Sequence, residues 1–205
     1  MPATMSTLSP ELGTAMEHVI LLDESGNALD RQDKRTAHTE STPLHLAFSC
    51  YLFDSAGQFL ATRRSLGKLT WPGIWTNSFC GHPQASERLA DAVARRAEFE
   101  LGLVLDEVRL VLPAFRYRAE FHGVVENEMC PVFYATARTE PRPNPAEVAS
   151  VQWLPWADFL RKTLADGSEF SPWCRLQAQQ LSALGATPGD WPAADPSALP
   201  PAARL

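Results

Sequence analysis

The apolar run from Leu44 to Phe53 constrains the fold of this chain more than any other feature of the sequence. It ends at the turn-forming residues 54–57, Asp-Ser-Ala-Gly, and a second apolar stretch from Phe59 to Thr62 follows. Two short apolar runs on either side of such a turn are typical of a β-hairpin. A strand without polar alternation is typically covered on both faces. We therefore expect a hairpin whose first strand is buried on both sides.

Helices are predicted at only a few places. Apolar residues recur at every fourth position from Leu89 to Leu101 within the segment 86–101, and Gly102 is a natural helix stop. Ser171 and Pro172 form an N-cap and first-turn pair that opens a helix ending near residue 185. A short amphipathic helix is expected at 156–164, and further strands at 19–22, 131–135 and 148–154. Runs of strands interrupted by few helices predict an α+β domain.

The two ends of the chain differ from this central part. Residues 1–15 carry no clear pattern, and residues 186–205 contain five prolines among alanines. Proline sustains neither a helix interior nor a β-ladder, so we expect flexible tails at 1–15 and 186–205. The folded domain is then predicted to span residues 16–185, a length that can bury a substantial core.

Charge and cysteine usage exclude several classes of function. The formal net charge of −6 provides no basic surface for nucleic acid, and no stretch approaches the ~20 apolar residues of a membrane span. The N-terminus lacks the basic-then-apolar layout of a secretory signal, and the four cysteines form no CxxC pair. We expect a reduced, cytoplasmic protein that binds neither nucleic acid nor membrane.

Three histidines have neighbours that set them apart from ordinary surface residues. His45 lies within the apolar run, where a polar ring needs a partner. His82 lies two residues after Cys80 in a turn-prone segment of small residues, and His38 precedes the apolar run. No zinc-type spacing is present, so the histidines alone indicate a metal only weakly.

Glu126 and Glu128 form the second candidate site. On a strand, residues i and i+2 point to the same side, so the two carboxylates would lie together. Adjacent carboxylates repel unless a cation, a proton or water separates them. Spacing alone leaves two interpretations open, a solvated strand edge and a divalent-metal site with one carboxylate available for proton transfer.

A basic cluster occurs in the loop from Thr62 to Lys68, which contains Arg63 and Arg64, and Arg95 and Arg96 follow on the predicted helix. Such side chains are often merely solvated. A compact basic group in an acidic protein also suits a diphosphate. Tryptophans are plentiful as well, and an indole face can stabilise a cation.

These segments together resemble the type 1 isopentenyl-diphosphate Delta-isomerases. The matching segments are His38-Thr39 with Leu44–Ser49, Trp71–Pro83, Phe115–Arg118 with Glu126–Glu128, and Phe170–Trp173. They occur in the family's order and spacing over roughly residues 17–185. The resemblance implies a Nudix-like α+β fold in one domain, a mixed β-sheet flanked by helices.

The Nudix box itself is altered in this chain. Gly81, Glu87, Arg95, Glu100 and Gly102 fall on its template. Arg96, however, replaces the first glutamate of the REUxEE core, and Phe99 replaces a later one. Nudix hydrolases use those carboxylates to hold metals on a diphosphate, so the replacements favour an isomerase over a hydrolase.

The resemblance also implies roles for individual residues. His38, His45, His82, Glu126 and Glu128 resemble the protein's metal ligands, a donor set that suits Mn²⁺, Zn²⁺ or Fe²⁺. Glu100 resembles the residue that helps hold Mg²⁺ on the substrate diphosphate, and Lys34, Arg64, Lys68 and Arg96 fall where the family contacts that diphosphate. Cys80 and Glu128 resemble the catalytic pair, with Tyr117 beside the glutamate. Trp173 resembles the aromatic residue that closes over the hydrocarbon.

The expected reaction interconverts isopentenyl and dimethylallyl diphosphate through a tertiary carbocation and feeds isoprenoid biosynthesis. Its expected partner is this small isoprenoid diphosphate, and we expect the protein to be a monomer. Which of Cys80 and Glu128 is the acid and which the base stays open. Two alternatives are a Nudix-type diphosphate hydrolase, and a regulatory domain that binds metal or diphosphate without turnover.

Overall fold

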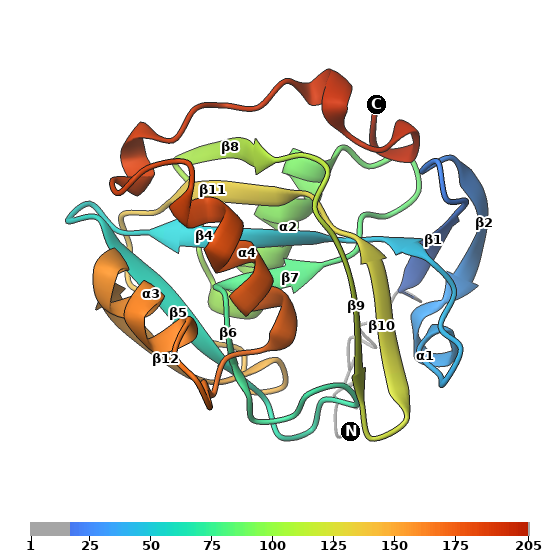
Figure 1. Ribbon diagram of the computed structural model, residues 1–205, viewed down its shortest axis with the longest axis horizontal. Helices are drawn as coiled ribbons and strands as arrows, with labels where there is room; N and C mark the ends of the chain where they lie inside the picture. Colours follow the sequence, from blue (N-terminus) through green and yellow to red (C-terminus); the bar gives the residue numbers. More distant parts are fainter. Residues whose placement is uncertain (1–16, 205) are drawn as a thin grey trace, which may run out of the picture.

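Two mixed β-sheets form the framework of the protein, of which the computed structural model describes residues 17–204 (Figure 1). The predicted tail at 1–15 lies outside the described residues. The first sheet has the order β2 (Ala28–Asp33), β1 (His18–Leu22), β3 (His45–Leu46), β10 (Val124–Met129) and β9 (Arg116–Phe121). The second has the order β12 (Val148–Pro155), β5 (Gln58–Arg64), β4 (Phe48–Phe53), β11 (Val132–Thr136) and β8 (Glu107–Leu112), with β6 (Trp75–Thr76) paired to β5 and β7 (Phe79–Gly81) paired to β4.

The predicted strand from Leu44 to Phe53 is divided between the two sheets. Its β3 part runs parallel to β10, and its β4 part runs parallel to β11. Between the two parts, the Ala47 backbone N–H donates to the Met129 carbonyl at 2.9 Å, where the neighbouring strand is also interrupted. The expected hairpin pairs only at Phe53 and Phe59, because β7 and β11 occupy the edges of β4 further along.

Strand β4 is buried on both faces, as predicted, and it separates two hydrophobic cores. All six of its residues are buried. Phe48, Cys50 and Leu52 pack into one core, while Tyr51 and Phe53 pack into the other. Alternate residues of a strand point to opposite faces, so this one segment contributes to both layers.

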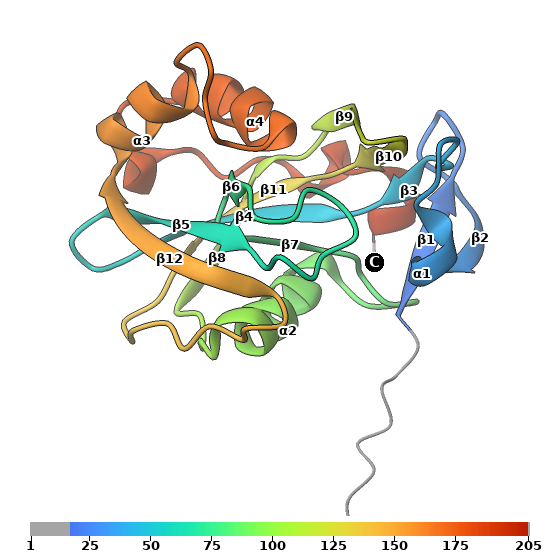
Figure 2. The same cartoon turned by 90° about the horizontal axis from the view of Figure 1, so that it is seen from below.

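Helices cover the two faces of the second sheet. Helix α2 (Leu89–Leu101) lies on one face, and α3 (Trp156–Thr163) and α4 (Pro172–Ser182) lie on the other (Figure 2). The short α1 (Lys34–Ala37) follows β2. Helix α2 ends at Gly102 in the left-handed conformation (φ 62°), and the Ser171 side chain caps α4 by accepting from the Cys174 N–H. Both predicted helix boundaries are confirmed.

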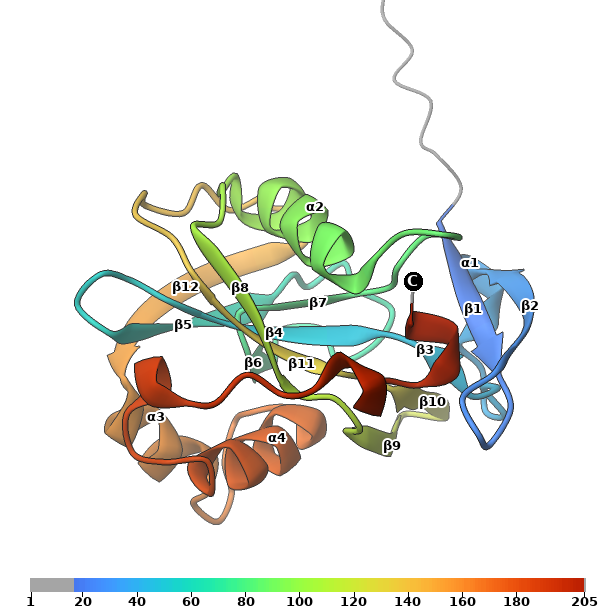
Figure 3. The same cartoon turned by 90° about the horizontal axis from the view of Figure 1, so that it is seen from above.

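The C-terminal segment corrects the prediction of a loose tail at 186–205. Residues 186–204 run across the molecule towards β1 and β2 (Figure 3) and form the short turns η1 (Pro188–Asp190), η2 (Pro196–Ala198) and η3 (Pro201–Ala203). The Trp191 side chain is fully buried. The Ala202 N–H donates to the Gly26 carbonyl at 2.9 Å. The prolines prevent a helix or a ladder, but they are compatible with 3₁₀ turns that dock side chains. Among the helices of residues 17–204, none has the length and apolar composition needed to cross a bilayer.

Candidate active site

A row of three polar side chains crosses the first sheet. Glu128 on β10 lies in register with His45 on the parallel strand β3 and with Tyr117 on the antiparallel strand β9. Directly opposed residues on paired strands point to the same face, so the three side chains lie side by side. All three are buried. The sheet therefore presents a carboxylate between an imidazole and a phenol.

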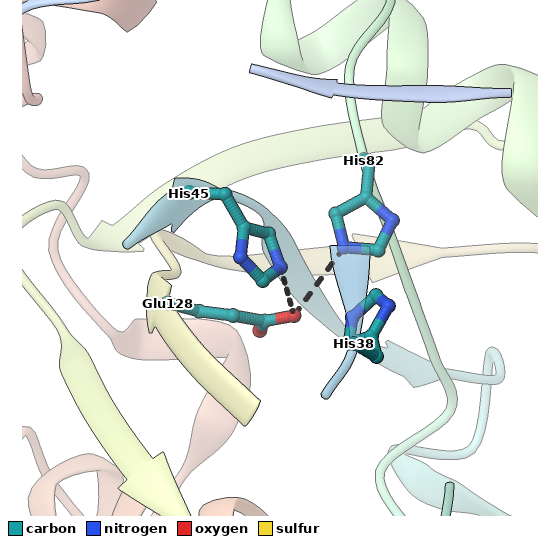
Figure 4. Close-up of side chains that lie close together, drawn as sticks. All are labelled: His38, His45, His82 and Glu128. Atoms are coloured by element: carbon teal, nitrogen blue, oxygen red, sulfur yellow. Dashed lines mark hydrogen bonds and ion pairs between the residues drawn. The ribbon is translucent and has the colours of Figure 1, made fainter. Parts of the chain in front are cut away.

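Two further histidines converge on Glu128 from outside the sheet (Figure 4). His38 follows α1, and His82 follows β7. The Nε2 atoms of His45 and His82 lie 3.4 Å and 3.3 Å from the same Glu128 oxygen. One ligand atom from each of the three histidines and Glu128 lies within 4.8 Å of all the others. Metal–ligand bonds of about 2.0–2.2 Å place opposed ligands roughly 4–4.4 Å apart, so this spread is close to that of a single-ion site.

Glu126 joins the cluster through His38, as the i, i+2 pattern predicts. The His38 Nε2 atom lies 3.1 Å from a Glu126 oxygen, and Glu126 belongs to the same side of β10 as Glu128. The carboxylate oxygen of Glu126 that faces His38 is buried without a hydrogen-bond partner. The sequence prediction that Glu126 and Glu128 lie on one side is confirmed.

The orientation of the imidazole rings fits a bound cation. The Nδ1 atoms of His45 and His38 lie 3.0 Å and 3.2 Å from the backbone carbonyls of Pro43 and Lys34. A carbonyl only accepts, so each Nδ1 carries a proton and donates. If these rings carry no second proton, their Nε2 lone pairs face carboxylate oxygens, a contact that is repulsive unless a cation lies between. This Nδ1–H to carbonyl pattern is the usual outer-shell support of a metal-bound histidine.

Protonation states also favour ligation. Burial lowers the pKa of His82 to about 3, so this imidazole is neutral at pH 7. Burial alone would raise the pKa of Glu128, but the neighbouring imidazoles of His82 and His45 outweigh this effect and hold that pKa well below its usual range. Burial also disfavours a charge on His38, but the nearby Glu126 carboxylate outweighs this effect and raises the pKa of His38. Metals bind deprotonated ligands, so His82 and Glu128 are already in the required form.

A cationic group lies beside this centre, on the buried face of α2. Arg96 is buried, and its guanidinium contacts Glu100 at 2.5 Å, Glu147 at 3.2 Å and Glu17 at 3.2 Å. Burial would lower the pKa of Arg96, but these carboxylates outweigh it and raise that pKa. Of the residues expected to contact the diphosphate or its Mg²⁺, the structure thus brings Arg96 and Glu100 into direct contact.

Two lysines complete the group, through carboxylates that the sequence analysis missed. Lys34 pairs with Glu17 at 2.5 Å, and Lys68 pairs with Glu147. Glu17 and Glu147 therefore each bridge a lysine to Arg96. The available signal was the position of Arg96 on an apolar helix face, because a buried guanidinium requires acidic partners. That signal predicts a carboxylate without identifying which one.

Arg64 is placed differently from the other cations. Its guanidinium donates to the backbone carbonyls of Thr70 and Trp71 at 2.8 and 3.2 Å, and lies 5.7 Å from the centre of the Trp173 ring. It is nevertheless close enough to Lys68 to help burial lower the pKa of that lysine. Arg64 thus lies between the cationic group and an aromatic cluster.

The aromatic cluster borders Tyr117. The Trp173 ring lies 5.8 Å from Tyr117 and meets Trp71 edge-on at 5.3 Å, and Trp71 packs on Phe121 at 5.4 Å. Trp173 is 3% exposed. A groove of about 400 Å³ opens beside Trp71 and Phe121. Trp71, Trp173 and Tyr117 are all buried, and the cluster is continuous through Tyr117 with the row that contains Glu128.

Cys80 on β7 is partly buried against this aromatic cluster. Its sulfur lies 3.3 Å from Ser49 Oγ and 3.3 Å from Asn77 Oδ1. Burial raises the pKa of Cys80 to about 11, and the Glu128 charge adds to that rise. The thiol therefore carries its proton at pH 7, because burial outweighs the hydrogen bonds with Ser49 and Asn77 and the charge of Arg64, which lower the pKa. The other three cysteines, Cys50, Cys130 and Cys174, are free, as expected of a reduced protein, and they are buried.

Comparison with known proteins places this arrangement in a family. The NUDIX domain matches residues 43–174. DR0079 from Deinococcus radiodurans has the same fold, with a TM-score of 0.63 at 19% identity over 80% of this chain and 98% of that one. The MutT protein from Methanosarcina mazei Go1 follows with a TM-score of 0.54 at 20% identity, over 69% and 94% of the two chains. The protein is therefore a NUDIX-domain protein in which a histidine and glutamate cluster lies beside a cationic group.

Curated relatives narrow the family further. The isopentenyl-diphosphate Delta-isomerase of Saccharopolyspora erythraea is 53% identical over 93% of this chain and 98% of its own length. That of Klebsiella pneumoniae subsp. pneumoniae is 52% identical over 82% of this chain and 92% of its own length. The chain belongs to the isopentenyl-diphosphate Delta-isomerase family. The resemblance expected from the sequence motifs is confirmed.

Proposed function

We propose that the protein interconverts isopentenyl diphosphate and dimethylallyl diphosphate by moving a carbon–carbon double bond. The observation that carries this proposal is the meeting of two side chains that are able to transfer protons, Cys80 and Glu128, with a buried aromatic cluster that contains Trp173. An alkene is a weak base, so its protonation needs a well-placed acid and a shielded cation. The site combines both requirements.

In the proposed reaction a proton is added to the terminal carbon, C4, of isopentenyl diphosphate. A tertiary carbocation forms at C3, and loss of a proton from C2 gives the allylic product. Cys80 and Glu128 perform these two transfers, one as acid and the other as base, and they exchange roles in the reverse reaction. Steps of this kind contribute roughly 10²–10⁴-fold each.

The aromatic cluster protects the cation. The indole face of Trp173 attracts positive charge, an effect worth about 2 kcal/mol when the pair is desolvated. Trp173 and Tyr117 are almost fully buried, with 3% and 7% exposure. Water is thus kept from a carbocation that it would otherwise trap as an alcohol. Tyr117 lies opposite Glu128 in the sheet and helps orient the carboxylate.

The metal ligands of the proposal are His38, His45, His82, Glu126 and Glu128, with Mn²⁺ or Zn²⁺ as the ion. Imidazole and carboxylate donors together suit these ions. A cation at this position would hold the Glu128 carboxylate in place and tune its proton affinity. The buried Nε2 of His45 and the buried Glu126 oxygen without hydrogen-bond partners support this assignment.

The cationic group receives the substrate's diphosphate. Lys34, Lys68 and Arg96 now pair with Glu17 and Glu147, so a diphosphate would compete with those carboxylates. Glu100 helps hold Mg²⁺ on the diphosphate, and Arg64 reaches the group from the side of Trp173. Arginine forks and lysine ammonium groups are the usual partners of phosphate oxygens.

The hydrolase alternative is weaker because two glutamates of the Nudix box are absent. Arg96 is buried among carboxylates, and Phe99 is 50% exposed on the outer side of α2. Neither can hold a metal on a diphosphate. We further infer that the enzyme acts as a cytoplasmic monomer and supplies isoprenoid biosynthesis.

The proposal is tested by incubating the purified protein with isopentenyl diphosphate, Mg²⁺ and Mn²⁺, with Cys80→Ala in parallel. Acid-labile dimethylallyl diphosphate should form with the wild type and not with the variant, and both proteins should contain the same amount of metal. Release of orthophosphate in place of the allylic product would support the hydrolase. Metal and diphosphate binding without any turnover would support a regulatory binding domain.

A further inference from the structure

A single side-chain oxygen contacts both Cys80 and Trp173. Asn77 lies between β6 and β7 and is fully buried. Its Oδ1 atom is 3.3 Å from the Cys80 sulfur, 3.1 Å from Trp173 Nε1 and 2.9 Å from Thr76 Oγ1. Each of these three groups can donate a hydrogen bond to the oxygen. The oxygen is therefore the common acceptor of the thiol and of the indole that face the proposed reaction.

The orientation of the Asn77 amide is determined by its other end. Its Nδ2 atom lies 3.1 Å from the Cys50 carbonyl and 2.8 Å from the Phe79 carbonyl, and both carbonyls only accept. A flipped amide would oppose its oxygen to these two carbonyls and its N–H to the Trp173 N–H. The position of Oδ1 is thus fixed by backbone carbonyls of β4 and of β7.

The chain around Asn77 also holds the start of α4, the helix that carries Trp173. The Ser171 N–H donates to the Trp75 carbonyl at 2.8 Å, and Ser171 Oγ lies 2.8 Å from Thr76 Oγ1. Ser171 is the N-cap of α4. Backbone and side-chain contacts therefore set where α4 begins. The Asn77 oxygen then sets how the Trp173 ring is turned on that helix.

We propose that Asn77 is a positioning residue that fixes the Cys80 sulfur and the Trp173 ring relative to one another. This inference rests on the proposed isomerase function. Proton transfer at C2 or C4 and stabilisation of the charge at C3 involve neighbouring carbons, so both groups must be placed together. Without Asn77 the thiol loses one acceptor, and the buried indole N–H is left unpaired and drives the ring to turn.

The expected effect is on turnover and not on substrate capture. Lys34, Lys68 and Arg96, which receive the diphosphate in the proposal, form ion pairs with Glu17 and Glu147. A misplacement of about 1 Å at the reacting groups costs on the order of 10²-fold in rate. Asn77→Ala should therefore lower kcat by about 100-fold. KM for isopentenyl diphosphate and the metal content should stay within about threefold of wild type.

Ser78→Ala is the matched control. Ser78 is the next residue and equally buried, but its hydroxyl donates to the Leu60 carbonyl at 2.7 Å and accepts from the Leu52 N–H at 2.8 Å. It touches neither Cys80 nor Trp173 through these bonds. Ser78→Ala should lower the melting temperature while leaving kcat within about threefold.

A second variant covers the case in which Asn77→Ala does not fold. Replacing Trp173 by benzothienylalanine keeps the shape of the ring and removes its N–H. This protein should retain its metal content and lose kcat by at least tenfold. It should also bind less tightly a diphosphate ester with a tertiary ammonium in place of C3, while inorganic pyrophosphate binds unchanged.

The outcomes separate this inference from the proposed function. A wild-type protein without isomerase activity would refute the function itself. An active wild type together with a folded Asn77→Ala variant whose kcat is within threefold would refute only the positioning role. A lower kcat together with a lower metal content and a higher KM in that variant would also overturn the positioning role, because these changes would indicate a general structural defect.

Discussion

Removal of the Trp191 side chain should destabilise the protein strongly, although it lies in a proline-rich segment. The ring is fully buried, 5.1 Å from Trp156 and 6.0 Å from Phe53, and its Nε1 donates to the Gly185 carbonyl at 3.0 Å. A buried aromatic side chain covers about 150–250 Å², or about 4–6 kcal/mol at ~25 cal/mol per Å². Measured Trp→Ala substitutions in cores cost about 3–5 kcal/mol. We expect Trp191→Ala to lower the free energy of unfolding by about 4 kcal/mol.

Urea unfolding followed by circular dichroism measures this loss. At about 2–4 °C per kcal/mol for a domain of this size, the melting temperature should fall by about 8–16 °C. Leu176→Ala is the control, because that side chain is 44% exposed on α4, and it should change stability by less than about 1 kcal/mol. A loss below 1 kcal/mol for Trp191→Ala would mean that residues 186–204 do not dock on the domain.

Three further results are expected at the site. Glu126→Gln should weaken Mn²⁺ or Zn²⁺ binding by at least about tenfold in metal analysis after dialysis, while Glu120→Gln on the exposed side of β9 retains the metal. Lys68→Met should weaken binding of inorganic pyrophosphate with Mg²⁺ by about tenfold in calorimetry, and Lys162→Met on α3 should not. Burial would raise the pKa of Glu147, but Lys68 and Arg96 outweigh it and lower that pKa, so its ionised form adds stability above its unfolded pKa of about 4.3. That stability is lost as pH falls through the lowered folded pKa. Glu147→Gln should therefore be less stable than wild type by about 1–3 kcal/mol at pH 7, and the difference should vanish in acid. A difference in stability that persists at low pH would count against the pairing.

Local patterns were sufficient to predict the parts of the site that lie on one element. Strand periodicity placed Glu126 and Glu128 on the same side of β10. The Ser171-Pro172 pair predicted the start of the helix that carries Trp173. These predictions succeeded because neighbouring residues of one chain segment decide them.

Features that depend on distant partners could not be predicted in the same way. The apolar run from Leu44 to Phe53 has no internal signal for a break, yet Ala47 marks one because the adjacent β10 ends there and β11 begins after Pro131. Each half then joins a different sheet. Pairing between segments more than eighty residues apart decided the outcome.

The same limitation applies to charge and to the C-terminal segment. Glu147 precedes an ordinary strand, and only the folded chain shows that it joins Lys68 to Arg96. The prolines after residue 186 correctly excluded a helix and a ladder, but they carried no information on docking. The pocket for Trp191 is built by Phe53 and Trp156, which are remote in the sequence.

The central claim is most directly tested by proton NMR of isopentenyl diphosphate incubated with the enzyme, Mg²⁺ and Mn²⁺ in D₂O. We expect the wild type to form dimethylallyl diphosphate and to incorporate deuterium at C2 and C4 of the exchanging pair, and we expect neither result with Cys80→Ala. Recovery of isopentenyl diphosphate without deuterium, or release of orthophosphate without the allylic product, would contradict the proposed isomerase reaction.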